Sequence, residues 1–170
     1  VSDDMQKYDH RSFRWVMATA TRILVSNWGV AQGYPMTSYQ AEGYGKLSYV
    51  RFLIQYVNYF RSPMLCQMLS YCDNESICTS MFTDPTTKYQ KSAIASDYDL
   101  INEIITSQDK LAELTGIKIE TKHIKAHQDK STEYSKLSRE AQLNVEADAL
   151  ASEALKEALR PAKPPAMDML

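Results

Sequence analysis

Hydrophobic and polar positions change their period along the chain, and each period predicts a different element. β-Branched and aromatic residues dominate between Phe13 and Gly33, and a polar break around Thr21 divides this stretch, which indicates two antiparallel strands. Thr37 and Gln40 then stand three positions apart, as in the capping box of a helix N-terminus. Apolar residues follow at spacings of three and four, at Tyr44, Leu47, Val50, Ile54 and Val57. The pattern predicts a hairpin and then a helix to about Tyr59.

The second half of the chain alternates between short apolar runs and helical patterns. The run at residues 64–72 is bounded by Pro63 and by polar residues, which favours a buried strand. Because a crossover helix precedes it, we expect a parallel strand. The remaining predicted elements are a short helix at 74–81, a helix that Ser96 caps and Gly116 closes, an edge strand at 117–126 and a helix at 139–159. This order predicts an α/β fold, a mixed sheet with helices on its faces.

The composition is that of a single domain. With 170 residues, of which 44% are hydrophobic, the chain can bury a core of its own. We expect one domain over residues 1–159 and a Pro-rich tail or linker at 160–170. The three cysteines contain no Cys-x-x-Cys pair, which fits neither a disulfide framework nor a zinc site. We therefore expect reduced thiols with no disulfide partner.

Charge and hydropathy narrow the expected partners and location. The sequence contains no apolar run of membrane-spanning length and nothing that resembles a signal peptide, so we expect no membrane partner and an intracellular location, in the cytoplasm or nucleus. The net charge is −2, which excludes a global attraction for nucleic acid. Binding to phosphates would have to come from a local patch, a metal ion or a neighbouring domain.

Three carboxylates occupy positions where apolar residues would be less costly. Asp73 directly follows the predicted buried strand, and Glu42 lies in the first turns of the capped helix. Asp148 lies one turn after Asn144 on the last helix, among small and apolar neighbours. If these carboxylates meet at one edge of the sheet, a hard cation is needed to relieve their repulsion. An all-carboxylate cluster favours Mg²⁺ or Mn²⁺ over zinc.

Two of these acids also have structural explanations. Asp73 is a favoured residue for a helix N-cap. Glu42, in a first turn, would interact favourably with the helix dipole. Asp148 is harder to explain in this way, because its neighbours leave only a narrow solvated face.

Five segments resemble, in order, the successive motifs of the ribonuclease H domain: "SDDMQ", "SYQAEGYGKL", "SYCDNES", "IKAHQDK" and "AQLNVEADALA". The version found in retrotransposon polyproteins, downstream of a reverse transcriptase, is especially similar. The resemblance runs from Asp3 to about Leu155. It implies a ribonuclease H-like fold with a central mixed five-stranded sheet flanked by helices. Because Asp3 lies at the very start of the sequence, we expect the first strand of that sheet to be truncated.

The resemblance implies a site of four carboxylates that holds two divalent ions, Mg²⁺ or Mn²⁺: Asp3, Glu42, Asp73 and Asp148. The ions would clamp the scissile phosphate of the RNA strand in an RNA/DNA hybrid, so the implied activity is that of an endonuclease. His127 would assist proton movement or product release and would matter less than the acids. Without the resemblance, His127 would be read as an exposed residue of a polar loop.

The resemblance also implies partners and substrate contacts. The substrate would be an RNA/DNA hybrid, and a reverse transcriptase domain would be covalently linked or associated. RNA would be distinguished from DNA by 2′-hydroxyl contacts across the minor groove. By position, Ser38, Tyr39 and Asn74 are the expected contacts to the hybrid.

One departure from the ribonuclease H pattern lies beside the first acid. The family continues with Gly-Ser, whereas this chain has Asp4-Met5, which adds charge and bulk next to the metals. This departure favours an alternative function, a catalytically impaired ribonuclease H-fold module that binds nucleic acid or supports an attached polymerase. Asp4 and, more distantly, Asp9 remain alternatives for the first acid. The "AEGYG" and "NVEAD" segments argue against an integrase or a proofreading exonuclease of the wider superfamily.

Overall fold

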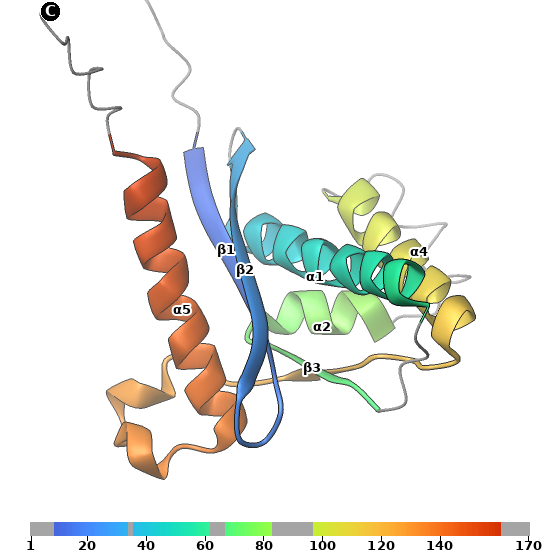
Figure 1. Ribbon diagram of the computed structural model, residues 1–170. Coiled ribbons are helices and arrows are strands. Elements are labelled where there is room, and N and C mark those ends of the chain that lie inside the picture. The colour runs from blue at the N-terminus through green and yellow to red at the C-terminus, as the bar shows by residue number, and fades with distance from the viewer. Residues whose placement is uncertain (1–8, 34–35, 62–66, 83–96, 161–170) are drawn as a thin grey trace, which may run out of the picture.

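The computed structural model describes residues 9–33, 36–61, 67–82 and 97–160, and it has a mixed α/β fold (Figure 1). The elements in chain order are β1 (Asp9–Ala18), β2 (Ile23–Gly33), α1 (Ser38–Phe60), β3 (Leu69–Cys72), α2 (Glu75–Phe82), α4 (Tyr98–Thr115), β4 (Glu120–His123), η1 (Gln128–Lys130), η2 (Tyr134–Lys136) and α5 (Arg139–Ala158). The predicted order of strands and helices is confirmed. The expected cap Ser96 and the tail from residue 161 onward lie outside the described residues.

The strands form two small sheets. β1 and β2 pair antiparallel, from Asp9 opposite Gly33 to Ala18 opposite Ile23. β3 and β4 pair in parallel, from Leu69 opposite Glu120 to Cys72 opposite His123. The predicted hairpin is therefore confirmed. β3 is a parallel strand, as predicted, but its partner is β4, and among the described residues it pairs with neither strand that precedes α1. Within the described ranges only these two pairs form, so the five-stranded central sheet is not shown, and the segment around Asp3 that was expected to supply its first strand lies outside them.

Helix α1 organises the hydrophobic core. Its capping box forms as predicted: the Thr37 hydroxyl accepts from the Gln40 N–H, and the Gln40 side chain accepts from the Thr37 N–H. The main core cluster consists of Trp15, Tyr49, Val50, Leu53, Ile54, Val57 and Leu111. Tyr44, expected on the buried stripe, is 42% exposed. At about 100° per residue it lies roughly 120° around the helix from Val50, outside the buried face.

Close approaches at glycines fix the position of α1. A Cβ at Gly43 would lie 2.7 Å from Leu100 Cδ2 of α4, and a Cβ at Gly45 would lie 3.2 Å from Phe13 Cβ of β1. On the other side of the hairpin, the Ser12 hydroxyl donates to the Ala151 carbonyl of α5 at 2.7 Å. Figure 1 shows α5 on one side of the hairpin and α1, α2 and α4 on the other.

Strand β3 is less buried than its apolar sequence predicts. Leu69 is 44% and Tyr71 is 39% exposed, whereas Ser70 and Cys72 are half-buried. Successive side chains of a strand point to opposite faces, and the face with Ser70 is the one that α1 contacts through Lys46. The prediction of a buried strand therefore holds for only one face of β3, the face that packs against α1.

Two further sequence expectations concern cysteines and membrane segments. Cys72 and Cys78 are free thiols, whereas Cys66 lies outside the described residues. Among the described helices, none has the length and apolar character needed to cross a bilayer.

Candidate functional site

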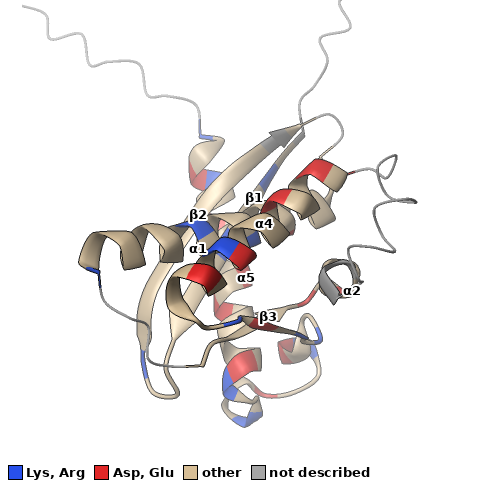
Figure 2. Cartoon of the chain, turned by 90° about the vertical axis from the view of Figure 1, so that its right-hand side faces the viewer, with Lys and Arg blue, Asp and Glu red and all other residues tan. Residues whose placement is uncertain are grey.

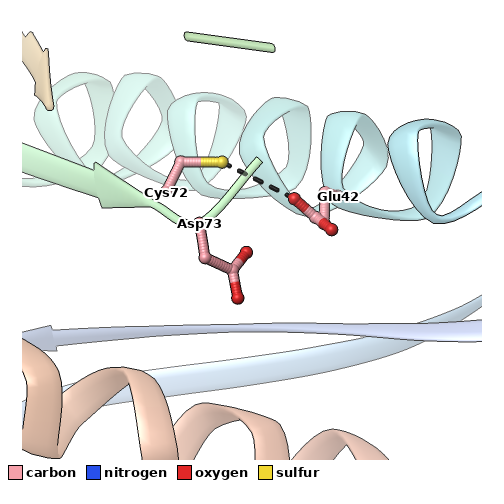
Figure 3. A group of neighbouring side chains, drawn as sticks. All are labelled: Glu42, Cys72 and Asp73. Carbon is pink, nitrogen blue, oxygen red and sulfur yellow. Dashed lines mark hydrogen bonds between the residues drawn. The ribbon is translucent and has the colours of Figure 1, made fainter. Parts of the chain in front are cut away.

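Two carboxylates from separate elements, Glu42 and Asp148, are near Asp73. One oxygen each from Glu42 of α1 and Asp73 after β3, together with the Cys72 sulfur, lie within 4.8 Å of one another (Figure 3). The Asn144 amide of α5 donates to Asp73 Oδ2 at 3.3 Å. Asp148, one turn further along α5, is close enough for the charge of Asp73 to raise its pKa. Glu42 and Asp73 therefore belong to one group of possible ligands, whereas Asp148 lies outside that group and is near Asp73 only.

Of the candidates for the first acid, only Asp9 lies within the described residues. Asp3 and Asp4 lie outside the described residues. Asp9 begins β1 opposite Gly33, and only its backbone is described. The predicted four-carboxylate set is therefore represented here by three members.

Asp73 is free to face the other acids because its neighbour caps α2. The Asn74 side-chain oxygen accepts from the Ile77 N–H at 3.2 Å, and the Asn74 carbonyl accepts from the Cys78 N–H at 3.2 Å. The N-cap role considered for Asp73 thus belongs to Asn74. The Asp73 carboxylate instead accepts from Asn144.

Glu42 lies in an environment that disfavours its charge. Burial, followed by the negative charge of Asp73, raises the pKa of Glu42 to about 7, while hydrogen bonds from Asn74 and Cys72 act in the opposite direction. Glu42 is the fifth residue of α1, and the first turn of that helix carries no acid. Because dipole effects fade beyond the first turn, they do not account for this glutamate. At neutral pH its position favours either a proton or a cation.

His127 stands next to Asp148. Its Nδ1 lies 3.6 Å from Asp148 Oδ2, and the two side chains are 59% and 43% exposed. The His127 backbone is left-handed, with φ 51°, which is uncommon for a residue other than glycine. Burial and the charge of Asp73 raise the pKa of Asp148, His127 lowers it, and Asp129 raises it further. His127 is therefore an exposed residue, as its loop position indicated, and also a neighbour of the acids.

Lys46 is a structural residue of the site that the sequence analysis missed. It follows Glu42 by one helical turn and is buried. Its ammonium donates to Thr121 Oγ1 at 2.5 Å and to Ser70 Oγ at 3.2 Å, and these two residues are paired across β3 and β4. Burial lowers the pKa of Lys46 to about 8. In the sequence, the sign of a buried lysine is that Lys46 stands next to Leu47, on the apolar side of the helix.

The predicted substrate contacts have different surroundings. Ser38 is exposed at the start of α1, and its hydroxyl accepts from Arg11 Nη1 at 3.0 Å. Tyr39 is half-buried and packs against the second core cluster, which contains Leu47, Ile101 and Ile104. Asn74 caps α2 and hydrogen-bonds Glu42. Ser38 is thus the most open of the three, and Tyr39 has a packing role.

Comparisons of the chain with protein-family models, with curated proteins and with solved structures found no match. The site must therefore be interpreted from the chemistry of its own residues.

Proposed function

We propose that this chain is a metal-dependent endonuclease of the ribonuclease H type, which hydrolyses the RNA strand of RNA/DNA hybrids as part of a reverse-transcribing element. The observation that supports this proposal best is the position of Asp73, which lies beside Glu42 and is near enough to Asp148 to influence its pKa. These residues come from three elements far apart in the sequence, and Asp73 raises the pKa of both other acids, after the effect of burial. Carboxyl groups whose pKa is raised by burial and by a neighbouring charge are frequent at functional sites.

The donor set fits hard divalent ions. Oxygen ligands from carboxylates are those that Mg²⁺ and Mn²⁺ prefer. A cation would offset the burial and the charge of Asp73, which together raise the pKa of Glu42. Asp3 is proposed as the fourth carboxylate on the basis of the sequence resemblance alone. Two bound ions would supply an activated water and stabilise the leaving oxygen.

The other residues of the site orient and support the acids. Asn144 holds the Asp73 carboxylate by donating a hydrogen bond. Lys46 fixes α1 against β3 and β4, which places Glu42 near the end of β3. His127, exposed beside Asp148, is positioned to pass a proton between the site and solvent. The acids are thus the proposed metal ligands, and His127 has a supporting role.

The proposed substrate is an RNA/DNA hybrid, contacted through Ser38 and Asn74. Lys and Arg positions are interspersed with Asp and Glu positions over the helices (Figure 2), and the net charge of the chain is −2. Phosphate contacts supply most of the affinity in non-specific nucleic-acid binding. We therefore propose that a linked or associated reverse transcriptase domain strengthens binding to the hybrid.

The test is cleavage of a hybrid labelled on its RNA strand, with Mg²⁺ or Mn²⁺ and with EDTA as the metal-free control. Asp73→Asn should reduce cleavage to background, because Asp73 is the acid that is near both Glu42 and Asp148. Asp109→Asn, at an exposed position on α4, is the matched control and should leave cleavage unchanged. His127→Ala should lower the rate by up to about 10²-fold, the low end of general acid–base contributions.

The substrate comparison makes this test specific. Only the RNA strand of the hybrid should be cut, and an RNA/RNA or DNA/DNA duplex of the same sequence should stay intact. Cleavage that persists in EDTA, or that Asp73→Asn leaves unchanged, would contradict the proposal.

A catalytically impaired binding module is the second candidate, and the Asp4-Met5 pair favours it. In that case the chain binds hybrid without cutting it. The double variant Asp4→Gly with Met5→Ser should then produce metal-dependent cleavage, which Asp73→Asn should abolish. A wild-type chain that already cuts hybrid rules out the impaired module.

A further inference from the structure

A thiol belongs to the same group as two of the acids. Cys72 Sγ donates its hydrogen to Glu42 Oε2 at 3.7 Å, and one ligating atom each from Glu42, Cys72 and Asp73 lie within 4.8 Å of one another. Figure 3 shows the Cys72 sulfur pointing toward Glu42, with the Asp73 carboxylate alongside. All three residues are half-buried rather than sealed, so an ion from solvent has access to them.

The spacing of these atoms suits a tetrahedral ion. With a zinc–sulfur distance near 2.3 Å and a zinc–oxygen distance near 2.1 Å, a tetrahedral centre places its sulfur and oxygen ligands about 3.6 Å apart. The separation between Cys72 Sγ and Glu42 Oε2 is 3.7 Å. Little rearrangement is therefore needed for these two atoms to share one ion, and Asp73 is near enough to supply a third ligand.

We propose that Glu42, Cys72 and Asp73 form a binding site for a thiophilic divalent ion of the zinc class, and that this ion excludes Mg²⁺ from the carboxylates. The site was not visible in the cysteine spacing, because a single thiol joins two carboxylates that are remote from any Cys-x-x-Cys pattern. The exclusion of Mg²⁺ rests on the proposed function, whereas the binding of the ion does not.

The sulfur of Cys72 makes the site selective, because a thiol that lies beside two carboxylates adds a soft ligand to two hard ones. When the ion binds, the S–H bond breaks, the sulfur donates its electron pair to the metal and the proton leaves to the buffer. Soft or borderline ions bind thiolate strongly enough to drive this exchange, whereas Mg²⁺ prefers oxygen. Mg²⁺ and zinc would thus use overlapping but different sets of ligands.

The experiment uses Cd²⁺ as the probe, because cadmium bound to thiolate gives a charge-transfer absorption in the ultraviolet. The whole chain is titrated with Cd²⁺ in a Cys66→Ser background, since Cys66 lies outside the described residues. Cys72→Ser should abolish the absorption and weaken Cd²⁺ binding by roughly tenfold or more, because even the loss of an outer partner of a metal ligand costs about 10–100-fold. Cys78→Ser is the matched control, because Cys78 is buried nearby and donates to the Cys72 carbonyl.

The outcomes separate this inference from the proposed function. Absorption that survives Cys72→Ser, or that Cys78→Ser removes, would overturn the inference. If Cys72→Ser fails to fold, Glu42→Gln provides the second test: it keeps the thiol, and unchanged Cd²⁺ affinity would also overturn it. Zn²⁺ should inhibit Mg²⁺-supported cleavage in Cys78→Ser more strongly than in Cys72→Ser. If the chain cleaves no hybrid but still binds Cd²⁺ through Cys72, the proposed nuclease function is rejected and the metal site is retained.

Discussion

Lys46 shows how one residue connects the core to the candidate site. Its ammonium is buried and donates to the hydroxyls of Ser70 and Thr121. Burial lowers its pKa from 10.5 to about 8, while the thiols of Cys72 and Cys78 act weakly in the opposite direction. The folded chain therefore holds the Lys46 proton less tightly than the unfolded chain does, which makes stability depend on pH.

The first prediction concerns the pH dependence of stability. Between pH 8 and 10.5 the unfolded state binds more protons at Lys46 than the folded state, so its contribution to the free energy of unfolding rises with pH across this window. Below pH 8 that contribution is constant. Across this window, the difference in the free energy of unfolding between wild type and Lys46→Met should change in favour of wild type by about 3 kcal/mol, at 1.36 kcal/mol per pKa unit. Urea unfolding of both proteins at a series of pH values measures it.

The comparison with Lys46→Met removes the effect of other groups that titrate in alkali. Burial raises the pKa of Tyr49 and of Cys72, and both residues are common to the two proteins. Lys110→Met, at an exposed position on α4, is the control and should differ from wild type by a constant amount. If the free energies of unfolding of wild type and Lys46→Met change in parallel with pH, the Lys46 ammonium makes no pH-dependent contribution to stability and the prediction is wrong.

At the level of single residues, the sequence identified acids better than their supporting groups. Glu42, Asp73 and Asp148 were found because carboxylates are conspicuous on apolar or capped segments. The cap formed by Asn74 and the bridge formed by Lys46 depend on which atoms meet in three dimensions. Cys72 was read only as a buried thiol, because its two carboxylate neighbours include Glu42, thirty positions away.

At the level of elements, the packing of α1 on the hairpin depends on an aromatic ring between two glycines. Phe13 of β1 is paired with Gly29 of β2, and its side chain also approaches Gly45 of α1. A Cβ at Gly29 would overlap the Phe13 ring. The ring therefore fills the space that the missing side chain of Gly29 leaves.

The second prediction is that Gly29→Ala destabilises the fold. Because the added methyl group must displace the Phe13 ring, the expected loss is about 1–3 kcal/mol, as for other overpacked sites. Phe13→Leu in the same chain should recover part of the loss, since it removes the atoms that clash. A double-mutant cycle from denaturant unfolding measures the coupling. Additive effects of the two changes would mean that the ring does not restrain α1 in this way.

Elements with a strong local signal were predictable, and elements defined by their neighbours were not. The capping box at Thr37 and the closing residue Gly116, with φ 72°, follow from local chemistry. The burial of β3 was overestimated, because its apolar sequence does not show which face packs against α1. The five-stranded sheet depended on a first strand around Asp3, outside the described residues.

At the level of the whole molecule, the candidate site lies where α1, the end of β3 and α5 approach one another. Helix α1 is tied to β3 and β4 by Lys46, and α5 is tied to β1 by Ser12. The contact between Asn144 and Asp73 links α5 to the end of β3. Glu42, Asp73 and Asp148 add like charges at this junction, so the metal-free fold includes electrostatic repulsion around Asp73. A bound cation would attract these carboxylates and so hold the three segments together.

The last prediction is that divalent ions stabilise the whole fold through this junction. At a Mg²⁺ concentration one hundred times its dissociation constant, the free energy of unfolding should rise by about 2.7 kcal/mol. Asp73→Asn should abolish this increase and, in EDTA, should stabilise the fold by roughly 1 kcal/mol, the scale of two charges about 4 Å apart in water. Thermal and urea unfolding with Mg²⁺ or EDTA measure both effects, with NaCl added to equal ionic strength because salt alone screens charges. Equal stabilisation of wild type and Asp73→Asn by Mg²⁺ would assign the effect to screening, and the three acids would then be a surface cluster without a bound ion.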